Sequence, residues 1–316
     1  MTLDALRSAA GMAGAKRALA AALAGLERDP DGEAAQALLD AAWREPKAHV
    51  VGVTGPPGVG KSSMCAALVA AWRRAGKTVG VIAVDPSSRT SGGALLGDRV
   101  RIVHDGADTG SFVRSMAARD RLGGLADQTL AAMVVMRALF DRVLIETVGV
   151  GQSETDVAGV ADTVVFCVQP GSGDSLQFMK AGIVEIPHLI VVTKADLGAA
   201  AERARADVAG ALSLAVAGDD ADWPVRALAV SSRSGAGLDG LMAALEAHRN
   251  HMAADGRLVV ARHRQSEGWV VESLRDRFGR DGIARLGRLG FDLALAPGVQ
   301  PFQRLRELGA ALETSR

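Results

Sequence analysis

The stretch VTGPPGVGKSS, residues 53–63, has the residue types and spacing of a phosphate-binding loop. Glycines let the backbone curl until several N–H groups face one phosphate, and a following helix adds the positive end of its dipole. A lysine at position 61 would reach the β- and γ-phosphates, and the next hydroxyl would bind Mg²⁺. The simpler alternative is a glycine-rich turn between a strand and a helix. The candidate nucleotide contacts are Gly55, Pro56, Pro57, Gly58, Val59, Gly60, Lys61, Ser62 and Ser63.

A bound triphosphate needs a metal ion, and Ser62, Asp85, Asp98 and Glu146 are the candidate Mg²⁺ ligands. Asp85 and Glu146 stand near the ends of apolar runs, and ligands of open α/β sheets bind at the carboxyl ends of the strands. A carboxylate in a run as apolar as the one before Glu146 is costly unless it is paired or bound to a metal. Asp85 could instead be a turn residue and Asp98 a solvated loop charge. Lys61 and Glu146 are the candidate catalytic residues.

The sequence TKAD, Thr193–Asp196, could select the base. A carboxylate at position 196 can accept hydrogen bonds from N1–H and the 2-amino group of guanine, and the stem of Lys194 can lie along the base. Thr193 stands where the usual guanine motif has asparagine. Taken alone, TKAD also fits a turn between a strand and a helix. Ser231, Ser232 and Arg233 fit a second loop that closes over the base.

The pattern around these motifs predicts a mostly parallel sheet flanked by helices. Short, continuous, β-branched runs alternate with helical lengths, which is typical of strands covered on both faces. Strands are expected at 49–55, 78–85, 141–147, 162–169, 188–194 and 225–232, and helices at 61–75, 237–248 and 262–280. Three parts follow: N-terminal helices at 1–46 that break at 28–33, a nucleotide-binding domain at 47–250, and a C-terminal helical arm at 251–316.

Composition limits the partners and the compartment. The 316 residues carry 36 Lys and Arg against 36 Asp and Glu, and 48% of them are hydrophobic. This balance is unlike a dedicated nucleic-acid binder or a membrane-surface protein, which usually has a basic excess. Cys65 and Cys167 lie far apart in apolar runs, as expected in a reducing compartment. We expect a cytoplasmic protein that binds neither nucleic acid nor membranes.

The chain resembles the methylmalonyl-CoA mutase-associated GTPases, the MeaB/ArgK family of P-loop GTPases. Besides the P-loop, the stretches that carry the resemblance are VIAVDPSSRTSGGALLGDRVR, FVRSMAARDRLGGLA, VLIETVGVGQSETDV, GSGDSLQFMKAGIVEI, VVTKAD and RHRQSEGWVVESL. The resemblance implies binding of GTP and GDP with Mg²⁺. It also implies a homodimeric chaperone that gates adenosylcobalamin loading of a cobalamin-dependent acyl-CoA mutase and protects that mutase.

The resemblance further implies roles for particular segments. Residues 86–100 and 147–156 would be two nucleotide-sensing switches, the second with Gly149, Gln152 and Glu154. Residues 171–182, with Asp174 and Lys180, would be a third switch that faces the mutase. The C-terminal arm would hold two chains together through Trp269, Val271, Leu274 and Phe278.

Other functions stay open at this point. A metal-insertion GTPase would need a metal site, for which His248 and His251 are the candidates, although they could equally lie on a solvated helix face. A kinase of a transport protein and a nucleotide-dependent scaffold with negligible hydrolysis are further alternatives. The arm could also simply cover the sheet, with Arg262, Arg264, Arg275 and Arg277 as ordinary solvated charges.

Overall fold

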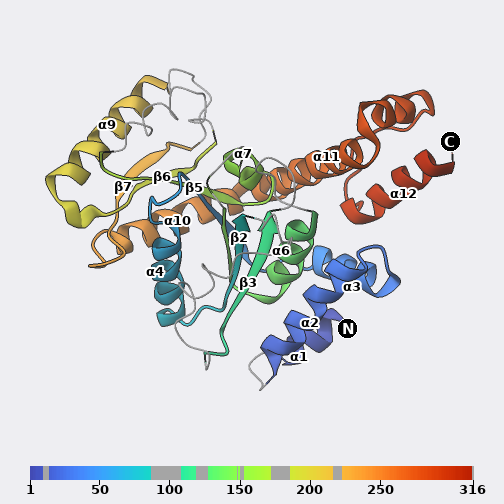
Figure 1. The fold of residues 1–316 in the computed structure, drawn as a ribbon, viewed down its shortest axis with the longest axis horizontal. Helices are drawn as coiled ribbons and strands as arrows, with labels where there is room; N and C mark the ends of the chain where they lie inside the picture. The colour runs from blue at the N-terminus through green and yellow to red at the C-terminus, as the bar shows by residue number, and fades with distance from the viewer. Residues whose placement is uncertain are drawn as a thin grey trace.

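A parallel seven-stranded sheet forms the centre of the protein (Figure 1). The computed structural model describes residues 1–9, 14–86, 108–118, 127–147, 149, 153–171, 186–215 and 223–314. The strands lie in the order β3-β2-β4-β1-β5-β6-β7, and all neighbours are parallel. They are β1 (His49–Thr54), β2 (Val79–Pro86), β3 (Ser111–Ala118), β4 (Arg142–Glu146), β5 (Thr163–Val168), β6 (Leu189–Val192) and β7 (Arg226–Ala229). The predicted fold class is confirmed, but edge strand β3 was not among the six expected strands.

Helices bury both faces of the sheet, and this explains the continuous apolar runs. Val50 of β1 faces α6 (Asp127–Leu139), whereas the next residue, Val51, packs on the opposite face. That second face is covered by α4 (Lys61–Arg74) and α10 (Leu238–Ala253). Helix α7 (Ser153–Ala158) packs on the α6 side of β1, and α9 (Ala199–Ala215) covers β6 and β7. Helix α10 runs five residues beyond the predicted end at 248.

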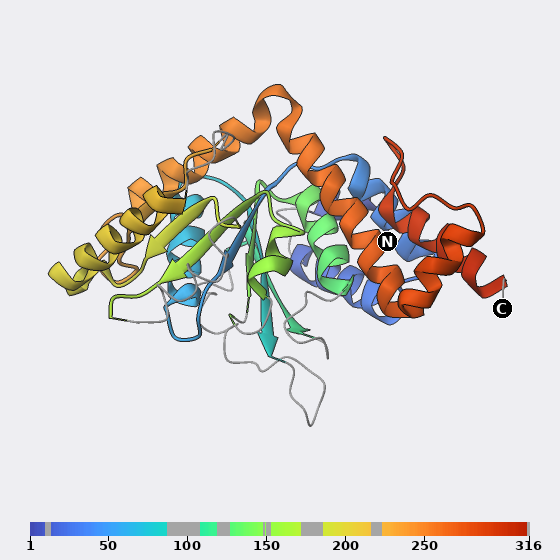
Figure 2. The same cartoon turned by 90° about the horizontal axis from the view of Figure 1, so that it is seen from above.

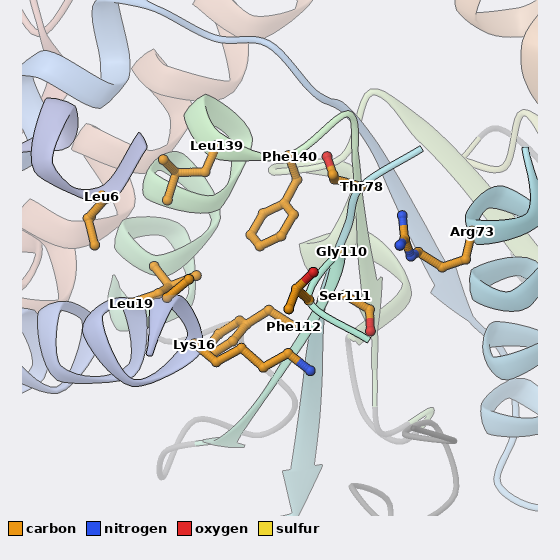
Figure 3. A pocket seen from close by; sticks show the side chains of 12 residues that line it. Leu6, Lys16, Leu19, Arg73, Thr78, Gly110, Ser111, Phe112, Leu139 and Phe140 are labelled. Atoms are coloured by element: carbon orange, nitrogen blue, oxygen red, sulfur yellow. The ribbon is translucent and has the colours of Figure 1, made fainter. Parts of the chain in front are cut away.

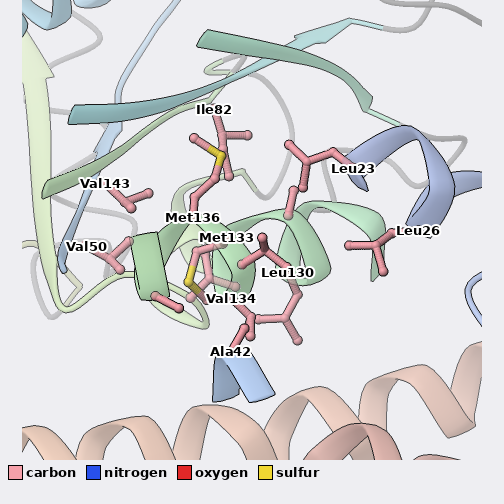
Figure 4. Close-up of a cluster of buried hydrophobic side chains, with 14 of the residues drawn as sticks. Leu23, Leu26, Ala42, Val50, Ile82, Leu130, Met133, Val134, Met136 and Val143 are labelled. Carbon is pink, nitrogen blue, oxygen red and sulfur yellow. The ribbon is translucent and has the colours of Figure 1, made fainter. Parts of the chain in front are cut away.

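The N-terminal helices extend the core on the α6 side (Figure 4). They are α1 (Leu3–Ala9), α2 (Ala15–Arg28) and α3 (Glu33–Arg44), so the break expected at 28–33 lies between α2 and α3. Leu23 of α2 and Ala42 of α3 pack on the same cluster as Met133 of α6. Burial of this apolar face joins the three helices to the sheet domain.

The C-terminal part is a long helix followed by a shorter one that packs back on it (Figure 2). Helix α11 (Arg257–Arg288) is interrupted at Gly279, whose φ is 70°, and α12 (Pro301–Thr314) follows. Two short 3₁₀ turns, η2 (Ala195–Leu197) and η3 (Ala254–Gly256), complete the described elements. No strand occurs in the described residues after 250, as predicted.

The apolar side chains of α11 that were expected to contact a second chain pack largely against other parts of this chain. Leu274 is fully buried against α12, and Phe278 packs in the same cluster. The ring of Trp269 lies 5.1 Å from that of Phe302, which in turn meets Trp43 of α3 at 6.4 Å. Leu274 is therefore used within this chain, whereas Trp269, Val271 and Phe278 are only partly buried, and the dimer contact through them stays a prediction.

Candidate nucleotide-binding site

The phosphate-binding loop lies between the carboxyl end of β1 and the start of α4. Gly55, Gly58 and Gly60 have φ values of 133°, 75° and 105°, which residues with a side chain rarely adopt. A Cβ at Gly55 would also lie 2.3 Å from the carbonyl oxygen of Cys167. Lys61 is the first residue of α4, so the helix dipole points at the loop. The backbone thus has the curvature that the sequence predicts for a phosphate cradle.

Lys61 points back into this loop. Its ammonium group donates to the carbonyl oxygens of Gly55 at 2.7 Å and Pro56 at 3.1 Å, and the residue is only 6% exposed. An ammonium group has three donors, so the same charge can turn toward a phosphate oxygen while it keeps a bond to the loop. Lys61 is therefore held inside the loop, turned away from solvent, which fits its predicted role at the phosphates.

Ser62 and Glu146 are brought together from positions far apart in the sequence. The Ser62 hydroxyl donates to Glu146 Oε1 at 2.6 Å, and Glu146 is 5% exposed at the end of β4. Hydroxyl and carboxylate oxygens are hard ligands that suit Mg²⁺. Asp85 stands at the carboxyl end of the neighbouring strand β2, opposite Ala117 of β3, but its side chain is not described. Asp98 lies outside the described residues.

Gly149 places the start of the predicted second switch directly against the phosphate-binding loop. Its φ is 75°, and a Cβ there would lie 1.9 Å from the Gly55 carbonyl oxygen and 2.6 Å from Lys61 Nζ. Only glycine fits such a close approach. Gln152, Asp174 and Lys180 lie outside the described residues, and Glu154 lies in α7 with its side chain undescribed.

The predicted base-binding residues lie beside the same loop. The carboxylate of Asp196 is exposed and accepts a hydrogen bond from the Ser231 hydroxyl at 2.6 Å. That bond is the main reason the pKa of Asp196 is lowered, so the group is an ionised acceptor at neutral pH. The backbone of Lys194 is left-handed, with φ 56°, and its ammonium group reaches Gln169 and the Gly58 carbonyl oxygen. Gln169 was not predicted, although it directly follows strand β5 at its carboxyl end.

Thr193 uses its hydroxyl to bond the backbone beside the phosphate-binding loop. Its buried hydroxyl donates to the backbone carbonyls of Val59 and Val168. A cavity of about 510 Å³ opens beside it. The lining residues come from the phosphate-binding loop, α4 and both predicted base loops: Gly60, Ser63, Ala66, Ala67, Ala70, Thr193, Lys194, Asp196, Ser232 and Arg233. The cavity adjoins the phosphate cradle where a purine base would lie.

The sequence profile of the methylmalonyl Co-A mutase-associated GTPase MeaB matches residues 18–284. The chain belongs to the MeaB family. GTPase ArgK of Escherichia coli is 34% identical over 272 residues, which cover 84% of this chain and 82% of ArgK. The mitochondrial methylmalonic aciduria type A homolog of Mus musculus is 35% identical over 266 residues, 80% of this chain and 64% of the mouse protein.

A solved structure agrees with the family assignment. The crystal structure of an LAO/AO transport system kinase aligns with a TM-score of 0.68 at 28% identity, covering 98% of this chain and 97% of that one. With the MeaB match, the phosphate-binding loop and the guanine-type motif, this identifies the protein as a GTPase that binds GTP and GDP.

Other features of this MeaB-family protein lie away from the nucleotide. His248 is completely buried, its ring 4.2 Å from that of His188, so the expected solvated helix face is wrong for this residue. Within the described ranges, no group of three or more His, Cys, Asp or Glu side chains is arranged to hold a metal ion. No helix in the described part of the chain is long and apolar enough to cross a membrane.

A second cavity, of about 390 Å³, lies at the other end of the strands, where β2, β3 and β4 begin (Figure 3). Thr78, Ser111 and Phe140 line it there, and Leu6 and Leu19 close it from α1 and α2. The nucleotide site lies at the carboxyl ends of the strands, so this apolar cavity is no part of it.

Proposed function

We propose that this GTPase uses Mg²⁺-dependent hydrolysis of GTP to gate the loading of adenosylcobalamin into a cobalamin-dependent acyl-CoA mutase and to protect that mutase. The observation that carries the proposal is the close approach of Gly149 to Lys61 and Gly55. Because this segment lies against the phosphate-binding loop, loss of the γ-phosphate can change its contacts and so signal to a partner.

The identity of the partner is supported by the family. The matching profile is described as mutase-associated, and the name of the mouse relative refers to methylmalonic aciduria. Asp174 and Lys180 would belong to the segment that faces the mutase. Ser62 and Glu146 would hold the Mg²⁺ together with Asp85 and Asp98, which supplies positive charge as the γ-phosphoryl group leaves.

A homodimer is part of the proposal, and the exposed start of α11 is a further candidate for its contact. Leu274 is buried within the chain, whereas Val259 and Val260 at the start of α11 are 72% and 50% exposed. Sedimentation of the unmodified protein and of a Val259→Asp variant would test whether this end of α11 joins two chains. Two equal monomer profiles would remove the dimer from the proposal.

Titration of a purified cobalamin-dependent mutase into the GTPase tests the main proposal. We expect slow turnover by the GTPase alone, faster turnover with the mutase, and different mutase affinities for the GTP and GDP forms. Lys61→Ala, which should not hold the triphosphate, is the matched control. If cobalamin-dependent mutases from the source cell neither bind nor change the rate, the chaperone role is wrong and the GTPase assignment stands.

A kinase activity is the second candidate, because the structurally similar protein named above is called a transport system kinase. The two activities differ in where the γ-phosphate goes. Labelled γ-phosphate released to water supports the GTPase, and label transferred to a transport protein supports the kinase.

A further inference from the structure

Helix α11 holds the end of α7 through a single side chain. The Gln265 amide donates to the carbonyl oxygen of Ala158 at 2.9 Å and to that of Ala161 at 2.8 Å. Carbonyls at the end of a helix have no partner within it and need one from outside. Both N–H bonds of the Gln265 amide are thus used to fix the point where α7 ends and β5 is about to begin.

One turn earlier on α11, a buried ion pair fixes the same junction. Arg262 donates to both carboxylate oxygens of Asp162, at 2.8 and 2.6 Å, and to the Ala48 carbonyl at 2.9 Å. Asp162 is 1% exposed at its side chain and also accepts a bond from the Val50 N–H. Arg262 is therefore no solvated charge, and removing either partner would leave a buried charge uncompensated. We call Arg262 and Gln265 the α11 latch.

Gly149, which precedes α7 in the chain, lies against the phosphate-binding loop. Gly149 leaves no space for a Cβ between itself and the Gly55 carbonyl or Lys61 Nζ. Helix α7 is equally close to the sheet, because a Cβ at Gly52 of β1 would lie 2.3 Å from Val157 Cγ2 and 2.9 Å from the Ala161 Cβ. Gly149 lies against the phosphate-binding loop, and the end of α7 is held both against β1 and by the latch, so a displacement of α7 has little slack before it reaches the latch.

We propose that α7 carries the nucleotide state to α11, with Gln265 and Arg262 as the positioning residues of this coupling. Contacts of the γ-phosphate with the chain at Gly149 would favour one placement of α7, and the latch would make α11 follow it (Figure 1). The coupling is reciprocal, so the state of the latch also sets the relative affinities for GTP and GDP. The inference rests on nucleotide binding by this chain and does not need the mutase.

Hydrogen exchange of the complete protein tests the coupling, with either GDP or a non-hydrolysable GTP analogue bound. In the unmodified protein, peptides from 153–165 and from 258–270 should both differ in exchange between the two nucleotides. Gln265→Leu keeps the size of the side chain but removes both donors. We expect it to keep the difference at 153–165, to lose the difference at 258–270, and to change the ratio of the two nucleotide affinities about 5-fold or more.

Gln303→Leu is the matched control, because Gln303 lies on α12 and its amide donates to the exposed Glu307. It should behave as the unmodified protein. A purely structural latch would alter thermal stability but leave the affinity ratio unchanged, and that result would overturn the proposal. Equal hydrogen exchange at 258–270 with the two nucleotides bound to the unmodified protein would also overturn it. So would a Gln265→Leu variant that keeps the exchange difference at 258–270. If that variant does not fold, Gln265→Lys, which retains a donor, must keep the difference and Arg262→Lys must reduce it.

Discussion

The hydroxyl of Thr193 lies 2.6 Å from the carbonyl oxygen of Val59 and 3.0 Å from that of Val168. It thereby joins the base-binding loop to the phosphate-binding loop and to β5. Thr193 is 3% exposed, so solvent cannot take over these bonds. A threonine in place of the usual asparagine therefore keeps a donor toward the phosphate-binding loop, and Asp196 remains the candidate for base recognition.

We expect Thr193→Val to weaken nucleotide binding about 10-fold, because the loss of a buried hydrogen bond costs about 1–3 kcal/mol. Thr193→Ser keeps the hydroxyl and should bind within about 3-fold of the unmodified protein by the same reasoning. Equilibrium titration with fluorescent GDP measures both. Equal affinities of the valine and serine variants would show that the hydroxyl does not hold the loop.

Lys61→Ala should weaken triphosphate binding about 10- to 100-fold without unfolding the protein, since hydrogen bonds to charged groups are worth about 1.5–3 kcal/mol. Lys77→Ala, which removes an exposed lysine that follows α4, is the control. Isothermal titration with a GTP analogue measures the loss, and circular dichroism checks the fold. A folded Lys61→Ala protein with normal affinity would contradict the phosphate role.

Asp196→Asn should erode the preference for GTP over ATP. The ionised carboxylate accepts from both donors of the guanine edge, whereas an amide offers one acceptor and introduces donors of its own. The same change should improve binding of xanthosine triphosphate, whose base has a carbonyl at position 2. Competition against fluorescent GDP measures all three nucleotides. Equal affinities of the unmodified protein for GTP and ATP would rule out guanine selection by Asp196.

Glu146→Gln should lower turnover more than nucleotide affinity. The glutamine oxygen can still accept the Ser62 hydroxyl, so the local structure should remain, but the negative charge at the proposed Mg²⁺ site is lost. We expect turnover to fall at least about 100-fold, since metal stabilisation of the transition state is worth several kcal/mol. Single-turnover hydrolysis over a range of Mg²⁺ concentrations measures this. Full turnover in excess chelator would contradict a metal role.

Stability should fall as the pH is lowered from 6.5 toward 4.5. Burial lowers the pKa of His49 and His188 to about 4 and that of His248 to about 3. Below pH 6.5 the unfolded chain therefore binds protons at these histidines, whereas the folded chain keeps the rings neutral. The stabilisation from the neutral buried rings is complete above pH 6.5 and decreases below it. Each histidine adds a slope of up to about 1.4 kcal/mol per pH unit.

Thermal unfolding across this pH range checks the slope. His248→Asn retains a polar group near the Thr163 hydroxyl, which lies 2.7 Å from His248 Nδ1, and should flatten the curve. His263→Asn, at a partly exposed position of α11, is the control and should not flatten it. The same slope in both variants would show that the buried ring does not set the pH dependence.

Much of the fold follows from local patterns. Strands β1, β4, β5 and β6 have continuous apolar runs because both of their faces are buried, and the glycines around Lys61 occur at spacings that fix the loop. Strand β3 was missed because Arg114 and Ser115 interrupt its apolar residues. Such an interrupted pattern does not indicate a strand by itself, and its pairing with β2 is supplied by the fold.

The sequence by itself determined the nucleotide chemistry, because a phosphate cradle is a local arrangement of one loop and one helix end. Only the tertiary structure decided which distant groups meet. Ser62 reaches Glu146, Thr193 reaches Val59, and Arg262 pairs with Asp162 across 100 residues. A polar side chain looks the same in the sequence whether it is solvated or buried. Packing of the surrounding helices removes the water, so each of these groups must find its partners within the protein.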